Sequence, residues 1–313
     1  MEPYKYDGII VVKASDLERV KSLLFTLKRN MPVERLVFIS SDEALDVLES
    51  VGYQNAGFVN ENDLLRFADV ERIIKKILRT EAVPRGIVGW YYQQFLKMSY
   101  ACICEDEYYL SWDGDTLPCK KFSMFSADNK TPCFDLKHEY CEEYFITMGK
   151  IIPGMHKVIE KSFISEHMLF NVNIMKNLIK TIEANNNLPG EKFYEKILYS
   201  INPEKIRYSS FSEFETYGTY VALTNPSAYR LRDWHSMRFG SFFFKPNEMD
   251  DAELAWLSKD FDAVSFEKDD MLITEYYELF HNEKYVNNLS ARQILEAIQE
   301  EAYEYANVKE VWD

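Results

Sequence analysis

The sequence predicts an α/β protein with a doubly wound, mostly parallel sheet flanked by helices and a helical C-terminal extension. Two apolar runs, residues 8–12 and 36–39, have the continuous hydrophobic character of strands that are buried on both faces. Each run is followed by a helix start signal, a capping-box pattern at Ser15 and Glu18 and an acidic turn at Asp42. Strands that alternate with helices favour a parallel sheet.

The first half of the chain continues this alternation. We expect helices over residues 16–29, 42–48, 63–78 and 89–98, and strands over residues 56–59 and 107–112. In open α/β sheets ligands gather at the carboxyl ends of the strands. The segment that follows residue 112 is therefore the first place to look for a site.

The second half is expected to be mostly helical. Residues 141–183 have a helical pattern with one break at Pro153, and the acidic stretch beyond Glu248 ends in a helix over residues 291–305. A soft boundary near residue 246 separates the main domain, 1–246, from a C-terminal segment, 247–313, that packs on it. We find no internal repeat.

The composition is that of an acidic globular protein. The 313 residues are 47% hydrophobic and carry a formal net charge of −15, which opposes general binding of nucleic acid. A nucleotide ligand is still compatible, because a divalent cation between carboxylates and a diphosphate reverses the local sign of the charge.

The cysteines and the lack of a long apolar stretch favour a cytoplasmic protein. The five cysteines are an odd number without a CxxC pair, which is typical of reduced thiols. The apolar run before Lys13 is too short for a signal peptide or a membrane span. A peripheral association with the inner face of a membrane stays open, and the sequence does not define the oligomeric state.

An acidic turn at residues 113–115 carries the strongest chemical signal. Asp113 and Asp115 follow the predicted aromatic strand at 107–112, and the intervening Gly114 permits a tight turn. Two carboxylates so placed can present oxygens to one Mg²⁺ or Mn²⁺, which neutralises a leaving diphosphate. The alternative is a purely structural turn. A second Asp-x-Asp string, at 260–262, lies in a predicted helical region and is expected to face solvent.

Three segments together resemble a known family. The sequences GWYYQQFLK at 89–97, WDGDTLP at 112–118 and SEFETYG at 212–218 are similar to the bacterial glycosyltransferase family labelled DUF6492, over roughly residues 5–240. The resemblance implies a GT-A fold, a nucleoside-diphosphate sugar as donor, and transfer to a hydroxyl of a glycan or lipid-linked glycan in capsule, O-antigen or exopolysaccharide assembly. It also assigns donor and acceptor binding to residues 1–246. Gly114 departs from the commoner Ser or Ala of the motif.

Several residues are candidates for donor binding in such a fold. They are Lys13 and Ser15 after the first strand, Gln93, Gln94 and Lys97 on the helix before the acidic turn, Trp112 beside that turn, and Arg238. Gln93 and Lys97 are i, i+4 neighbours on one helix face. The alternative for Lys13 and Ser15 is a capping loop, and the alternative for the residues of the helix is a solvent-exposed helix surface. The basic group of Arg230, Arg232 and Arg238 can instead balance nearby carboxylates.

Two glutamates are candidates for the catalytic base. An inverting transferase needs a carboxylate to accept the proton of the acceptor hydroxyl, and Glu213 is our first choice, with Glu215 second. They share one side of the backbone if the segment is extended, whereas a helix would place Glu213 next to Tyr217. The alternative is that both cap a helix and form ion pairs, and retention of configuration also stays open.

Two histidines are candidates for a further metal ligand or a diphosphate contact. His167 lies at a predicted helix start, whose positive end would face an anion, and His235 lies in the basic segment 230–238. Either can instead be a structural residue.

Two other functions share some of these features. A sugar nucleotidyltransferase would also use an acidic metal turn, but it would want a glycine-rich phosphate loop, which residues 11–15 do not contain. A catalytically silent glycan-binding module would suit the aromatic content of 15%. Metal-dependent binding of nucleotide separates the leading hypothesis from this last one.

Overall fold

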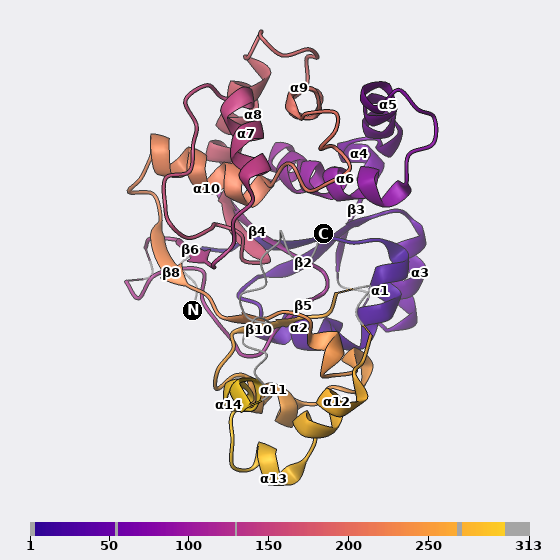
Figure 1. The fold of residues 1–313 in the computed structure, drawn as a ribbon, viewed down its shortest axis with the longest axis vertical. Coiled ribbons are helices and arrows are strands. Elements are labelled where there is room, and N and C mark those ends of the chain that lie inside the picture. The colour runs from indigo at the N-terminus through magenta and orange to yellow at the C-terminus, as the bar shows by residue number, and fades with distance from the viewer. Residues whose placement is uncertain (1–3, 54–55, 129, 268–270, 298–313) are drawn as a thin grey trace.

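A computed structural model of the chain describes residues 4–53, 56–128, 130–267 and 271–297 (Figure 1). Its central sheet has the strand order β3-β2-β1-β4-β7. The strands are β1 (Asp7–Val11), β2 (Arg35–Ser40), β3 (Gly57–Asn60), β4 (Tyr108–Trp112) and β7 (His167–Asn171). All neighbours are parallel except β7, which runs antiparallel to β4. The predicted α/β fold with a mostly parallel sheet flanked by helices is confirmed.

The strands are apolar on both faces because the sheet lies between two hydrophobic cores. Ile9 of β1 packs into one core and its neighbour Ile10 into the other, and β2 divides Val37 and Phe38 in the same way. Side chains that alternate between the faces of a strand produce this division. The continuous apolar runs of the sequence are therefore explained by two covered faces.

Helices cover each face of the sheet (Figure 1). The first core contains α4 (Glu61–Leu64), α5 (Phe67–Leu78), α6 (Arg85–Ser99), α7 (Glu142–Ile151), α8 (Val172–Glu183), α9 (Phe193–Ser200) and α10 (Glu213–Thr224). The second contains α1 (Ala14–Val20), α2 (Leu24–Asn30), α3 (Glu43–Ser50), α11 (Asp251–Leu257), α12 (Thr274–Phe280), α13 (Glu283–Val286) and α14 (Ala291–Ala297). Short 3-10 turns are η1 (Lys21–Leu23), η2 (Tyr100–Cys102), η3 (Gly240–Phe242) and η4 (Pro246–Glu248).

Two small sheets attach distant segments to this framework. One joins β5 (Thr116–Pro118), β10 (Ala263–Ser265) and β9 (Ser236–Met237), and the other joins β6 (Cys133–Leu136) to β8 (Arg230–Asp233). Strand β10 belongs to the segment after residue 246, yet it pairs with two strands that precede this position. The described part of the C-terminal segment therefore shares a sheet and a core with the rest of the chain.

Several elements differ from the prediction. The helix expected over 16–29 is divided by a 3-10 turn, and Lys13 is the N-cap of α1, so the capping box predicted at Ser15 is wrong. The helical stretch expected over 141–183 contains the strand β7, whose five residues are too few to reveal a period. The helix expected over 291–305 is observed as α14, and its end beyond residue 297 lies outside the described residues. None of the described helices has both the length and the apolar character needed to cross a bilayer.

Candidate active site

The carboxyl edge of the central sheet brings several polar segments together. Lys13 follows β1, Asp113 follows β4, and Glu166 immediately precedes the antiparallel β7. The backbone N–H of Asp113 donates to the carbonyl oxygen of Glu166 at 2.9 Å. Glu166 has a φ of 63°, a conformation that is uncommon for a residue with a Cβ. The structure therefore places Asp113 between the end of β1 and the start of β7.

The acidic turn is held from both sides. The N–H of Thr116 donates to the Asp113 carbonyl at 3.1 Å, and the N–H of Phe266 donates to the Asp115 carbonyl at 2.8 Å. A Cβ on Gly114 would lie 3.1 Å from Cγ2 of Ile10, so a larger residue would press on β1. The glycine at this place is explained by its close approach to the sheet.

Lys97 joins the acidic turn to α10. Its ammonium lies 2.6 Å from Oδ1 of Asp113 and 2.7 Å from Oε1 of Glu213, and the lysine side chain is only 5% exposed. Burial alone would lower the pKa of Lys97, but attraction to Asp113 and Glu213 outweighs burial and raises it. The same burial raises the pKa of Glu213, and Lys97 opposes that rise. The three side chains form an acid–base–acid bridge in which Lys97 and Glu213 are buried and Asp113 is partly exposed.

Replacement of Lys97 by methionine tests the bridge. Lys97→Met would leave the buried Glu213 without its cation, so we expect a loss of about 3–5 kcal/mol in the free energy of unfolding. The double variant Lys97→Met/Glu213→Gln should recover part of this loss. Urea unfolding would measure both, with Lys180→Met on the exposed face of α8 as the matched control. Equal stability of Lys97→Met and the parent protein would contradict the bridge.

Asp115 lies among groups of both signs. Burial, followed by repulsion from Glu267 and Asp113, raises the pKa of Asp115 to about 8, and Arg19 and Arg238 oppose the rise. Asp115 therefore holds a proton more readily than an ordinary aspartate does. A bound cation would favour its ionised form.

The donor set suits a hard divalent cation. Carboxylate oxygens are the ligands that Mg²⁺ and Mn²⁺ prefer, and one or two are enough where phosphate oxygens and water complete the shell. The described residues contain no group of three or more His, Cys, Asp or Glu side chains arranged to hold a metal. Among the described residues, Asp113 and Asp115 therefore do not belong to a protein-only cage.

His167 is part of the core. It begins β7 and not a helix, so the predicted helix start is wrong. Its Nδ1 lies 2.8 Å from the carbonyl of Ser165 and its Nε2 lies 2.8 Å from Oδ2 of Asp135, while its ring stacks on Trp112. Both ring nitrogens are engaged within the protein, which agrees with the structural alternative, and the role of His167 as a metal ligand stays a prediction.

Trp112 and Gln94 also lie inside the protein. Trp112 is fully buried, and its Nε1 donates to the Thr116 carbonyl at 2.7 Å. Gln94 is buried as well, with its amide donating to the Trp90 carbonyl and its Oε1 accepting from the N–H of Glu213 at 3.1 Å. Both side chains are thus engaged within the protein, and their contact with a donor stays a prediction.

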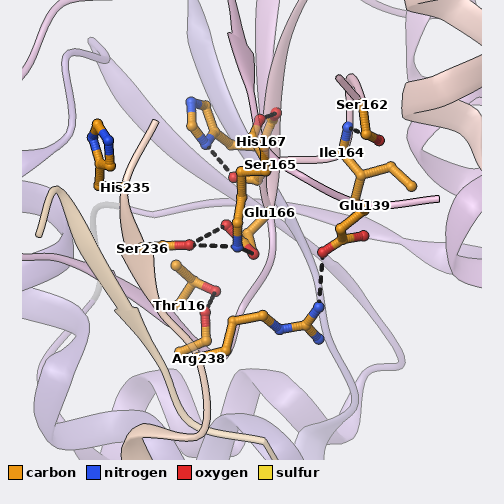
Figure 2. Close-up of polar contacts among 12 residues, drawn as sticks. Thr116, Glu139, Ser162, Ile164, Ser165, Glu166, His167, His235, Ser236 and Arg238 are labelled. Atoms are coloured by element: carbon orange, nitrogen blue, oxygen red, sulfur yellow. Dashed lines mark hydrogen bonds and ion pairs between the residues drawn. The ribbon is translucent and has the colours of Figure 1, made fainter. Parts of the chain in front are cut away.

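His235 is half exposed and lies beside Asp262. Its Nδ1 is 3.8 Å from Oδ2 of Asp262, and its backbone N–H donates to the same oxygen at 3.1 Å. Figure 2 shows His235 set apart from Arg238. Asp262 also pairs with Lys120, so this aspartate anchors β10 and is not simply solvent-facing.

The remaining donor candidates are accessible. Lys13 and Ser15 are exposed, and Gln93 is half buried. Nζ of Lys13 lies 3.8 Å from the position that a Cβ on Gly89 would take, so the lysine lies over the glycine of α6. Donor contact by these three residues stays a prediction.

The basic group does not form one clamp. Arg232 pairs with Asp135 at 2.5 Å, and Arg238 donates to Glu139 at 2.9 Å and to Glu267 at 2.7 Å. Arg230 is exposed on β8. The described contacts of Arg232 and Arg238 thus agree with the alternative in which these arginines balance carboxylates.

Glu213 and Glu215 lie in the first turn of α10, so the helical alternative holds. Glu213 faces Lys97, whereas Oε2 of Glu215 accepts from the hydroxyl of Ser162 at 2.6 Å and from the N–H of Phe163 at 3.1 Å. Ser212 caps the helix by accepting from the N–H of Glu215. Only Glu213 is connected to Asp113.

A second buried charge network lies next to the acidic turn (Figure 2). Lys137 donates to Glu166 at 2.6 Å and to Ser236 at 2.8 Å, and Ser236 donates to Glu166 at 2.9 Å. Burial would raise the pKa of Glu166, but Lys137 and Arg238 lower it. Sequence analysis did not identify Lys137, Glu139 or Glu166, because no local spacing marks residues that meet only in the fold.

The solved structures that are compared with this chain match it at low identity. No family model and no curated protein matches the sequence. Mouse xyloside xylosyltransferase 1 in its apo form is 13% identical with a TM-score of 0.43, covering 86% of this chain and 99% of that chain. The galactosyltransferase LgtC, in complex with donor and acceptor sugar analogs, is 10% identical with a TM-score of 0.40. The match covers 88% of this chain and 95% of LgtC. The apo bifunctional glycosyltransferase WbbM is 10% identical with a TM-score of 0.40, and the match covers 95% of this chain but 52% of WbbM. The resemblance to the DUF6492 family stays a prediction.

Proposed function

We propose that this chain is a metal-dependent glycosyltransferase of the GT-A kind, which moves a sugar from a nucleoside-diphosphate sugar to a hydroxyl of a glycan. The observation that carries the proposal is the position of Asp113 and Asp115. They follow a central strand at the carboxyl edge of the sheet, where ligands of open α/β folds bind. The resemblance of three sequence segments adds a cell-surface glycan or lipid-linked glycan as acceptor.

Each group has a distinct role in this proposal. Asp113 and Asp115 would hold Mg²⁺ or Mn²⁺, which supplies charge neutralisation for the diphosphate as it leaves. Lys13 and Gln93 would contact the donor from β1 and α6. Lys97 holds Asp113 in place, since its ammonium lies 2.6 Å from Oδ1.

Nucleotide binding should depend on the metal. The net charge of −15 and the carboxylates of the acidic turn repel a diphosphate, so we expect UDP or GDP to bind at least about 10-fold more weakly in EDTA than in Mn²⁺. Titration calorimetry measures this difference. A thermal-shift panel of UDP-, GDP-, CMP- and dTDP-sugars would then select the donor, because a ligand at ~100 times its dissociation constant adds about 2.7 kcal/mol.

The outcome separates the proposal from its alternatives. Equal affinity in both buffers would mean that lysine and arginine side chains alone hold the diphosphate. Absence of nucleotide binding with Mn²⁺ would favour a silent glycan-binding module. A sugar nucleotidyltransferase is not favoured, since the turn between β1 and α1 has no glycine and is closed by Lys13 as N-cap.

A further inference from the structure

A residue in an unfavourable backbone conformation holds the N–H of Asp113. Glu166 has a φ of 63°, and its carbonyl oxygen accepts from the N–H of Asp113 at 2.9 Å. The left-handed region of φ is unfavourable for a residue with a Cβ, because the Cβ comes too close to the following carbonyl oxygen. Such a conformation persists only where the surrounding structure imposes it. Whatever holds Glu166 therefore also bears on the geometry of the acidic turn.

The side chain of Glu166 is anchored at both carboxylate oxygens. Lys137 donates to Oε1 at 2.6 Å, and Ser236 donates to Oε2 at 2.9 Å. Lys137 also donates to the hydroxyl of Ser236 at 2.8 Å, and all three residues are buried. Figure 2 shows Ser236 linked to Glu166. Hydrogen bonds between charged groups in a buried place are strong, so they can hold this carboxylate, and with it the backbone, in one arrangement.

The two anchors belong to separate parts of the fold. Lys137 follows β6, and its backbone exchanges hydrogen bonds of 3.2 Å and 2.9 Å with Ser162, shortly before Glu166. Ser236 lies in β9, which pairs with β10, and β10 pairs in turn with β5. Strand β5 begins where the acidic turn ends. The network therefore ties the segment before β7 to the small sheet that continues from the acidic turn.

We propose that Lys137 and Ser236 are positioning residues, which fix the left-handed backbone of Glu166 and thereby orient the acidic turn for its cation. The inference rests on the proposed metal-dependent function. A change of φ at Glu166 would rotate the peptide group that follows it, and so would move the carbonyl that accepts from Asp113. Asp113 is then held through its side chain by Lys97 and through its backbone by Glu166. Lys137 and Ser236 act through Glu166 and need no contact with the donor.

Two double variants separate the backbone of residue 166 from its side chain. Lys137→Met/Glu166→Ala and Lys137→Met/Glu166→Gly both remove the buried pair, so neither leaves one buried charge without its partner. They differ in the ease with which residue 166 adopts a positive φ, which glycine tolerates and alanine does not. We expect Mn²⁺-dependent nucleotide binding to be about 5- to 30-fold weaker in the first variant than in the second. Titration calorimetry with Mn²⁺ and UDP or GDP, at a temperature where both variants are folded, measures this difference.

Arg79 provides the matched control. It is exposed at the end of α5, has a φ of 52° and is not part of the candidate site. Arg79→Ala and Arg79→Gly therefore differ in the same backbone preference as the two double variants. Their stabilities should differ in the same direction, but their affinities for nucleotide in Mn²⁺ should be equal. A difference in binding at residue 166 alone distinguishes positioning of the acidic turn from a general effect on stability.

Amide exchange gives a second readout that needs no metal. The N–H of Asp113 should exchange with solvent deuterium faster in Lys137→Met/Glu166→Ala than in Lys137→Met/Glu166→Gly, because its bond to the carbonyl of residue 166 is weakened. Equal exchange and equal nucleotide affinity in these two variants would overturn the positioning role and leave the proposed function standing. If the parent protein binds neither UDP nor GDP in Mn²⁺, nor any sugar nucleotide of the thermal-shift panel, the proposed function fails and this inference fails with it.

Discussion

Asp113→Ala and Asp115→Ala are each expected to lower sugar transfer by roughly 10²–10³-fold, the loss typical of removing one group that stabilises developing charge. The two carboxylates would act on one cation, so the double variant should be little worse than either single variant. Initial rates at saturating Mn²⁺ and donor measure both effects. Nucleotide affinity in Mn²⁺ should fall to its value in EDTA.

The choice of control follows from the structure. Asp63 is exposed in the short helix α4, so Asp63→Ala should leave transfer unchanged. Asp262 is unsuitable because it accepts from the backbone of His235 and pairs with Lys120. Near-native transfer by Asp113→Ala or Asp115→Ala in the presence of a chelator would exclude the proposed metal role.

Much of the fold could be predicted because the signals are local. Strands β1 and β2 contain continuous apolar runs, and the helix α1 that follows β1 begins at the polar residue Lys13 as its N-cap. The strand β7 could not be recognised, since the five residues His167–Asn171 lead directly into α8 and resemble the start of one long helix. Its identity as a strand depends on pairing with β4, which is a long-range contact.

Residues of the candidate site could be predicted only where the residue type and the position at the end of a strand both indicated a site. The acidic turn at Asp113 combines a chemical pattern with a strand end, and it lies at the carboxyl edge as expected. Trp112, Gln94 and His167 were selected by residue type and proximity in sequence, but burial turns all three toward the protein. The spacing of residues in the sequence does not show whether a single side chain is exposed, because the element that covers it can come from a distant part of the chain.

The ion pairs around the acidic turn could not be predicted from the sequence either. Glu139, Glu166 and Arg238 come from three separate segments and form their ion pairs only after folding. An arginine in a basic stretch, as Arg238 is, looks available for an anionic ligand, yet its two terminal nitrogens donate to Glu139 and Glu267. A buried arginine between two acids is better suited to holding them in place than to clamping a diphosphate.

Glu213→Gln is expected to lower the rate of transfer by at least about 100-fold if Glu213 is the base. The amide keeps the shape of the side chain, and Lys97 retains Asp113 as a partner, so nucleotide affinity in Mn²⁺ should survive. Burial raises the pKa of Glu213, and a base works only when ionised, so the acidic limb of the transfer rate should lie above the ordinary glutamate range. That limb should disappear in the variant.

Glu215→Gln is the matched comparison for Glu213→Gln, because both glutamates lie in the first turn of α10. Glu215 accepts from Ser162 and Phe163, whereas Glu213 faces Lys97 and the acidic turn. We therefore expect Glu213→Gln to lower kcat with little change in the acceptor KM, and Glu215→Gln to leave kcat close to that of the parent protein. Native transfer by Glu213→Gln would reduce this carboxylate to a structural partner of Lys97, and a retaining mechanism without a dedicated base would then describe the site better.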